Sequence, residues 1–415
     1  MAIPEHPDPS AVEALPPEPH RLRVLAGACG TGIGLGLIRS DFGVLGHEMV
    51  AQSWIPESDL GALAALNMVG YLLGCVHQAQ LKGKAQLLRS LRLALIVAVV
   101  SLWLGAAQSG EVGEGGLRVL AGWSAGHLMS GLPGLALAGI DARHQRQAVA
   151  VVMGGGALVA LLGASAVAWL APVSAGGAWM VLAAFATVLS LPTFWLIAQG
   201  RRRLQAMQLG GQEQQVAIAD QGVMAVRWPP FIALLCGFVL TGAALVPMAL
   251  YEPIVASTRI GLNASMSSAS FSAMGLGGLV GSILLLVVPR AWPTALLLPA
   301  VTLLGGVGAW IYATSRSSEL LLLAAFLIGW WSIMTSTLTL DRLPDLVPAE
   351  LQRRCWATFT TLNGLGFVIF SMGTRSLAVS ALQVVLWLGV LLIGCVLLAQ
   401  LLQIGGRSRS TRPSW

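Results

Sequence analysis

The chain has 415 residues, of which 56% are hydrophobic and only 10% are charged, and its formal net charge is +6 at pH 7. An ordinary soluble domain is about 25% charged, so this composition and a mean hydropathy of +0.77 exclude one and predict an integral membrane protein. The positive charge fits membrane topology and attraction to anionic lipid headgroups. The basic residues form no aromatic-interleaved patch, so we expect no nucleic-acid partner.

The chain begins with an acidic, proline-rich stretch that lacks the basic start and short apolar core of a signal peptide. We expect residues 1–21 to form a disordered tail. Apolar runs of roughly 20 residues follow, which is the length a helix needs to cross a hydrocarbon core about 30 Å thick. The twelve predicted spans are 22–46, 58–79, 88–108, 116–140, 148–171, 178–198, 229–251, 264–288, 294–314, 319–341, 355–374 and 379–403.

A long polar stretch divides these spans six and six. We interpret 199–228 as a linker between an N-terminal half, 22–198, and a C-terminal half, 229–403, with a tail at 404–415. Short basic loops, DARHQRQ and PAELQRR, precede the fifth helix of each half. The predicted fold is therefore all-α, with twelve transmembrane helices in two pseudo-symmetric halves. This is the plan of transporters built from parallel repeats, which bind substrate at mid-membrane between the halves.

Basic residues indicate the orientation, because Lys and Arg are retained on the cytoplasmic side. With the N-terminus inside, 19 of the 24 Lys and Arg residues fall in inner segments and 3 in outer ones. We expect the linker and both termini to be cytoplasmic and the protein to be a multi-pass component of the inner, cytoplasmic membrane.

Glycines four residues apart recur in several spans. Such spacing puts small residues on one face of a helix and lets neighbouring backbones approach closely. The pairs are Gly32 and Gly36, Gly70 and Gly74, Gly122 and Gly126, and Gly277 and Gly281.

Two short motifs carry a family resemblance. The segments RVLAGWSAG at 118–126 and ALNMVGYLLG at 65–74, within the twelve-helix plan, resemble the major facilitator superfamily and its bacterial YbfB/YjiJ-type branch. The resemblance implies secondary transport and gives Arg118, in the fourth span, a role in proton coupling; snorkelling to the outer interface is the alternative. The loop after the second span has Gln78 and no acid where the family has an Asp, so gating through that Asp is not expected.

The charges within the first span are costly in a bilayer and suggest function. Arg39 and Asp41 are about 200° apart on a helical wheel at about 100° per residue. They therefore face different neighbours. We predict that Arg39 binds an anionic substrate and that Asp41 is the exchangeable proton carrier, since Asp can lose its charge and Arg cannot. The alternative for Arg39 is snorkelling to the outer interface.

Trp123 and His127 share one face of the fourth span, and a mid-membrane His can exchange protons near neutral pH. We predict both as substrate-binding residues, with helix packing as the alternative. The other predicted cavity residues, for which packing is also open, are Asn67, Tyr71, Trp330, Trp331 and Asn363. We expect Glu252 to be a solvated loop residue.

These features predict a proton-coupled secondary transporter of a small organic solute. An excess of cationic groups over the acid Asp41 favours an organic anion, and the tryptophans favour a partly aromatic one. The alternatives are a proton-driven efflux pump for hydrophobic drugs and a non-transporting assembly or sensor protein. The sequence has no nucleophile–base set, metal-ligand spacing or phosphate loop, so we expect no enzymatic activity, cofactor or metal. The expected partners are the substrate, protons and membrane lipids, with the protein as a monomer.

Overall fold

The computed structural model describes residues 20–40, 42–170, 173–209, 226–252, 255, 264–289 and 291–405. Within these ranges the regular structure is helical, without a strand. This confirms the predicted all-α class.

The first predicted span is divided in the structure. A nine-residue π-helix, η2, lies between two α-helices, where the sequence predicted one continuous helix over 22–46. The π-helix contains Gly32 and Gly36, whose bare Cα atoms approach Val159 and Ala160 of a neighbouring helix so closely that an added Cβ would lie within 2.7 Å of them. Segments of π-helix are rare in proteins, and those that occur are frequently found at functional sites. The N-terminal elements are α1 (His20–Thr31), η2 (Gly32–Ser40), α2 (Phe42–Ala51), α3 (Glu57–Gln80), α4 (Lys84–Leu104), α5 (Gly110–Leu137), α6 (Ala142–Leu170) and α7 (Ala175–Leu209).

The second half of the chain closely follows the predicted spans. Its last two helices differ most, because α13 continues to Ser380 and α14 begins after it. The elements are α8 (Trp228–Ala249), α10 (Ala264–Val287), α11 (Thr294–Thr314), α12 (Ser318–Arg342), the 3-10 turn η3 (Leu343–Asp345), α13 (Ala349–Ser380) and α14 (Leu382–Gly405).

Eleven helical segments in the described ranges are long and apolar enough to cross a membrane. The remaining predicted span corresponds to α5, which has 28 residues but carries Glu114, Arg118 and His127. All three side chains are buried, and α5 packs against α3 and α4. The polar groups of α5 therefore face protein, as the cost of placing them in lipid requires.

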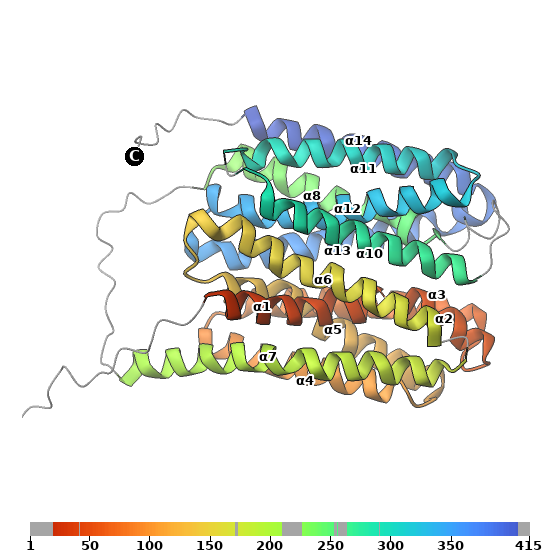
Figure 1. The fold of residues 1–415 in the computed structure, drawn as a ribbon, viewed down its shortest axis with the longest axis horizontal. Coiled ribbons are helices and arrows are strands. Elements are labelled where there is room, and N and C mark those ends of the chain that lie inside the picture. The colour runs from red at the N-terminus through yellow and green to blue at the C-terminus, as the bar shows by residue number, and fades with distance from the viewer. Residues whose placement is uncertain are drawn as a thin grey trace, which may run out of the picture.

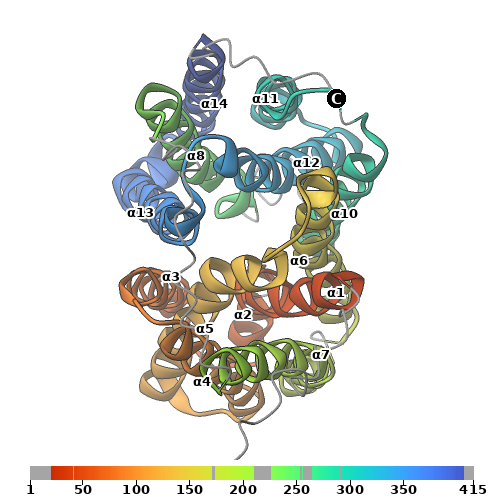
Figure 2. The ribbon, with the colours of Figure 1, turned by 90° about the vertical axis from the view of Figure 1, so that its left-hand side faces the viewer.

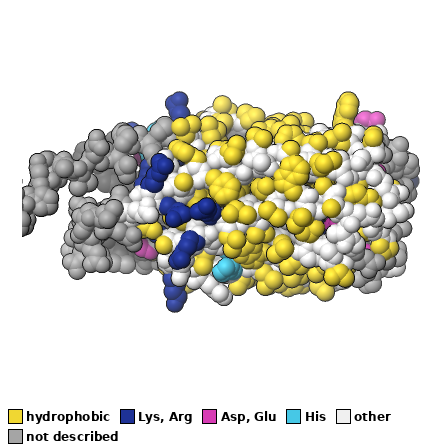
Figure 3. All heavy atoms as spheres, turned by 90° about the horizontal axis from the view of Figure 1, so that it is seen from below, with side chains coloured by type: hydrophobic (Ala, Val, Ile, Leu, Met, Phe, Trp, Pro, Cys, Tyr) yellow, Lys and Arg dark blue, Asp and Glu magenta, His cyan; other side chains and the backbone are white. Residues whose placement is uncertain are grey.

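The helices form two groups that lie side by side (Figure 2). We call α1–α7 the N-terminal bundle and α8–α14 the C-terminal bundle. They meet where α6 packs on α10 and α3 packs on α13. The end of α7 and the start of α8 lie at one end of the molecule, on the left in Figure 1, which we call the linker end; the opposite end is the distal end. Lys and Arg gather as a band beside the linker end (Figure 3).

The predicted glycine pairs lie at close helix contacts. A Cβ added to Gly70 or Gly74 of α3, or to Gly122 or Gly126 of α5, would collide with a backbone carbonyl of the facing helix. On α10, a Cβ on Gly277 would collide with the Phe326 carbonyl of α12, whereas a Cβ on Gly281 would meet the side chains of Met334 and Trp330. These contacts confirm the prediction of close backbone approach, which brings the polar groups of α3 and α5 within hydrogen-bonding reach.

Candidate functional site

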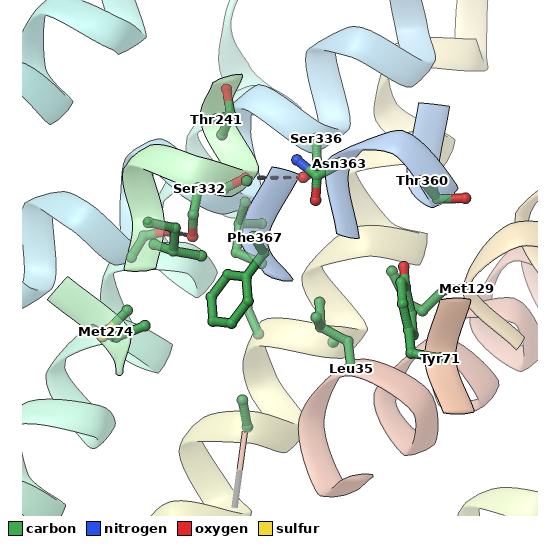
Figure 4. Close-up of a pocket in the computed structure, with 18 of the residues that line it drawn as sticks. Leu35, Tyr71, Met129, Thr241, Met274, Ser332, Ser336, Thr360, Asn363 and Phe367 are labelled. Carbon is green, nitrogen blue, oxygen red and sulfur yellow. Dashed lines mark hydrogen bonds between the residues drawn. The ribbon is translucent and has the colours of Figure 1, made fainter. Parts of the chain in front are cut away.

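A cavity of about 260 Å³ lies between the two bundles. Its wall comes from η2, α3, α5 and α6 on one side and from α8, α10, α12 and α13 on the other. Figure 4 shows Tyr71 and Met129 on the N-terminal side, Ser332 and Met274 on the C-terminal side, and Phe367 between them. The polar side chains of the wall are those of Asn67, Tyr71, Thr241, Ser332, Ser336, Thr360 and Asn363. Both bundles therefore contribute hydrogen-bonding groups to one site.

The rest of the cavity wall is apolar. The larger apolar side chains are Met68, Met129, Met153, Met274, Phe238, Phe271, Trp356 and Phe367. None of the described lining residues is Lys, Arg, His, Asp or Glu. Methionine is flexible and polarizable and adapts to irregular apolar shapes. This part of the wall suits a ligand with an apolar or aromatic body and a few hydrogen-bonding groups.

Two asparagines of the wall have the same local arrangement on the facing helices α3 and α13. Asn67 Nδ2 donates to the Arg118 carbonyl at 3.3 Å, and Asn363 Nδ2 donates to the Phe238 carbonyl at 2.6 Å. Each bond ties its asparagine to a neighbouring helix of the same bundle and so orients the amide. Each amide has, besides this bond, a second N–H and an oxygen acceptor.

Each of these contacts also depends on a glycine four residues after the accepting carbonyl. A Cβ on Gly122 would collide with the Asn67 carbonyl, and a Cβ on Gly242 would collide with the Asn363 carbonyl. The small residue lets the asparagine helix lie close enough for its side chain to reach the neighbouring backbone.

The linker side of the cavity is closed by contacts between α13 and the N-terminal bundle. Trp356, which is 2% exposed and lines the cavity, donates its indole N–H to the Met129 carbonyl at 3.1 Å. One turn closer to the linker end, Arg353 donates to the carbonyls of Gln78 and Leu81, at 3.2 and 2.5 Å. Arg353 thereby binds the end of α3: the Gln78 carbonyl, which also accepts from the Leu81 N–H at 3.4 Å, and the carbonyl of Leu81, the residue just after the helix. We call these two bonds the Arg353 clasp.

A second group of contacts between the bundles surrounds Arg146 of α6. Arg146 Nε lies 3.2 Å from Asp341 Oδ2, and Nη2 donates to the Trp292 carbonyl at 2.8 Å and to Thr294 Oγ1 at 3.0 Å. Thr294 also donates to Asp341 at 2.6 Å. At the distal end the described hydrogen bond between the bundles joins Ser165 and Ser272, 3.4 Å apart. The described bonds across the bundles thus concentrate at the linker end and hold the cavity closed there.

Of the residues predicted to bind substrate, Asn67, Tyr71 and Asn363 lie in the cavity wall. Trp330 and Trp331 do not lie in its described wall. Trp331 is fully buried with its ring over Gly305 of α11, and its indole N–H donates to Thr302 Oγ1 at 3.3 Å. Trp330 turns the other way, against Gly281 of α10. The two indoles point to different neighbours because adjacent helical residues project about 100° apart, and their role in substrate binding stays a prediction.

Trp123 and His127 are also outside the described cavity wall. His127 is fully buried, with Nδ1 2.7 Å from Gln78 Oε1 and 3.1 Å from Ser90 Oγ, and Nε2 3.1 Å from His77 Nδ1. The Trp123 ring packs beside both imidazoles, with centroids 4.4 Å from His127 and 6.0 Å from His77. The shared face of α5 was predicted correctly, but it contacts α3 and α4 and not the cavity. The sequence analysis missed His77 and Gln78 as partners.

Arg118 is 1% exposed and does not snorkel. Its guanidinium carbon lies 4.5 Å from the centroid of the Trp179 ring on α7, and Glu114 lies one turn earlier on the same helix. Glu114 is 2% exposed and accepts a hydrogen bond from Ser109 at 3.0 Å. The sequence analysis missed this acid, although its spacing of four residues from Arg118 is a recognisable pairing signal. Glu252, expected to be solvated, is 0% exposed.

The charged pair of the first span is Arg39 and Asp41. Asp41 and the side chain of Arg39 lie outside the described residues. The backbone of Arg39 is at the end of η2, one turn beyond Leu35, which lines the cavity. The assignments of these two residues therefore stay predictions.

Comparison with protein families finds a match over residues 31–401 to the family described as uncharacterised MFS-type transporter YbfB. Comparison with curated proteins finds no match. Among solved structures, the chain is similar to the human organic anion transporter MFSD10 (TETRAN), with a TM-score of 0.68 and 15% sequence identity. The likeness covers 93% of this chain and 100% of the human one. At this identity it shows a shared fold.

Proposed function

The chain belongs to the YbfB-type family of MFS transporters, and we propose that it moves a small organic solute across the cytoplasmic membrane by alternating access. The observation that carries this proposal is the cavity between the bundles, to which Asn67 and Tyr71 contribute from one side and Asn363 and Ser332 from the other. A ligand bound by both bundles can stabilise one relative arrangement over another, which is the requirement for a ligand-driven conformational change.

We further propose that the linker end is cytoplasmic, so that this structure represents a conformation closed to the cytoplasm. The band of Lys and Arg at that end supports the assignment, since basic residues are retained inside. Reporter fusions at residue 215 and at the C-terminus should be active only in the cytoplasm. External activity of either fusion would contradict the assignment.

The substrate class is proposed in two forms. The first is an organic anion. It requires a positive charge near the cavity, which Arg39 would supply from its position one turn beyond Leu35. The fold likeness to a human organic anion transporter is compatible with this form. The second is a neutral or weakly polar hydrophobic compound. The described part of the cavity wall favours it, because that part has methionines and aromatic rings and no charged side chain. This second form corresponds to efflux of hydrophobic compounds.

A thermal-shift screen of the purified protein tests the proposal. Metabolite and drug libraries serve as probes, because a compound that binds the folded state raises the apparent melting temperature. The matched variants are Thr360→Val, which alters the cavity wall, and Thr358→Val, an exposed position on the same helix. A cavity ligand should lose stabilisation in the first variant only. The compounds that bind should also be transported into proteoliposomes that contain the wild-type protein. Binding without transport would favour the assembly or sensor alternative.

A further inference from the structure

The polar cluster of His77, Gln78, Ser90 and His127 is not part of the cavity wall, yet its geometry orders the protons on both imidazoles. The Gln78 Oε1 atom can only accept, so His127 donates from Nδ1 across the 2.7 Å contact. The other nitrogen of a neutral imidazole is an acceptor. His77 Nδ1 then donates to His127 Nε2 across 3.1 Å. The remaining nitrogen, His77 Nε2, is the acceptor at the end of this chain.

The chain of contacts connects the surface to a buried group. His77 is exposed and lies one turn from the end of α3, whereas His127 is fully buried. A proton that binds His77 Nε2 forms an N–H bond there, and the bond between His77 Nδ1 and its hydrogen can break as that proton moves to His127 Nε2. His77 is then neutral in its other tautomer, and His127 is an imidazolium that holds the added positive charge.

Burial opposes a positive charge on His127, so the groups that face it determine how much of that cost is offset. The groups that face it are His77 and Gln78 from α3, Ser90 from α4 and Trp123 from α5. Oxygen atoms of Gln78 and Ser90 lie at Nδ1, and the Trp123 ring centroid is 4.4 Å from the His127 centroid, a distance at which a cation is attracted to an indole. The described contacts of these five residues include no carboxylate, so the charge would not be neutralised by an acid.

Gln78 connects this cluster to the contact between the bundles. Its side chain accepts from His127, and its backbone carbonyl accepts from Arg353 of α13. A single residue, Gln78, would therefore separate the charge on His127 from the Arg353 guanidinium, which holds the linker end closed. Two positive charges in a partly buried region repel each other more strongly than in water. Protonation of His127 thus disfavours the Arg353 clasp.

We propose that His77 and His127 form a proton-binding site at the linker end, and that proton transfer to His127 releases the Arg353 clasp and opens the cavity on that side. This inference rests on the proposed alternating-access function. It adds a histidine pair outside the cavity to Asp41 and Arg118, the coupling residues that the sequence analysis predicts.

Pulsed electron paramagnetic resonance can test the proposal in lipid nanodiscs. Spin labels on Gln80→Cys and Leu351→Cys, both exposed positions, report the separation of α3 and α13 in a background without the five native cysteines. The pH is lowered from about 8 to about 5, the range in which histidine titrates. The ratio of long to short distances should rise between about 5- and 150-fold, the usual range for coupling between two sites.

Histidine variants provide the comparison. His127→Gln and His77→Gln should abolish or strongly reduce the acid response, whereas His144→Gln, an exposed histidine outside the cluster, should retain it. A full acid response in both cluster variants would overturn the proposal. Arg353→Gln should increase the long distances at both pH values. If Arg353→Gln increases the long distances while the distances in the wild type do not depend on pH, alternating access is supported and the proton site is refuted. If neither the substitution nor acidification alters the distances, the proposed function is refuted as well.

Nitrogen-15 NMR of the histidine-labelled wild-type protein gives a test without substitution in the cluster. At high pH, both His127 and His77 should carry their hydrogen on Nδ1. Finding the hydrogen of neutral His127 on Nε2 would contradict the proton order on which the proposal depends.

Discussion

Removing one hydrogen bond between the bundles should open the linker end of the cavity. In Trp356→Phe, the indole N–H that reaches the Met129 carbonyl at 3.1 Å is lost, while an aromatic ring remains to pack against Phe238, whose centroid lies 5.6 Å away. A net hydrogen bond contributes about 0.5 to 1.5 kcal/mol. If the bond exists only in the closed conformation, the ratio of open to closed molecules should rise about 2- to 13-fold.

Alkylation of a cysteine in the cavity measures this ratio. Ser336→Cys, in a background without the native cysteines, places a thiol in the cavity wall. An impermeant maleimide added from the linker side of oriented vesicles reaches the thiol only in molecules that are open there. When opening is brief and the closed state predominates, the alkylation rate follows the open population, so the rate should increase by the same 2- to 13-fold.

The control is Trp292→Phe, which changes a tryptophan at the linker end that is 56% exposed. Its alkylation rate should match that of the parent protein. An unchanged rate in Trp356→Phe, with normal thermal stability, would show that the Trp356 bond does not distinguish the two conformations. The reasoning that the linker-end contacts close the cavity would then be refuted.

Local sequence patterns determined the features that were predicted correctly. The thickness of the bilayer sets the length of an apolar run, so helix positions could be read from composition along the chain. Glycines four residues apart indicate a flat helix face, and the structure places Gly70 and Gly74 against α5. Asn67 and Asn363 lie in the cavity wall, as expected of polar groups that avoid lipid, and their role in substrate binding stays a prediction. Each of these inferences needs only the residue and its near neighbours in sequence.

The remaining features depend on which helices become neighbours. A helical wheel correctly put Trp123 and His127 on one face, but this part of α5 is largely buried in protein, so the wheel could not distinguish a face toward the cavity from a face toward α3 and α4. The ring over which Arg118 lies belongs to Trp179 on α7, far along the sequence. The π-helix at 32–40 packs two of its glycines, Gly32 and Gly36, on α6. The spacing of Gly32 and Gly36 predicts close packing, but no local signal identifies the neighbouring helix in any of these contacts.

Two further predictions concern helix packing and the charged pair of the first span. Gly122→Ala should lower the free energy of unfolding by about 1 to 3 kcal/mol, because its Cβ would collide with the Asn67 carbonyl; Gly116→Ala, with nothing within 4 Å of its Cβ, should change the free energy of unfolding by less than about 0.5 kcal/mol in the same thermal or denaturant measurement. For Asp41 and Arg39, the proposed roles predict different losses of function. Asp41→Asn should abolish accumulation driven by a pH gradient yet retain ligand binding and exchange, because an amide cannot carry the proton but preserves the size of the side chain. Arg39→Ala should lose binding of an anionic ligand, because a fixed positive charge that stays ionised at every working pH is removed. Proteoliposome uptake and thermal-shift binding on the same preparations separate the two effects. Wild-type accumulation in Asp41→Asn vesicles under a pH gradient would show that the exchangeable proton is carried elsewhere, and the histidine pair at the linker end would then be the remaining proposed carrier.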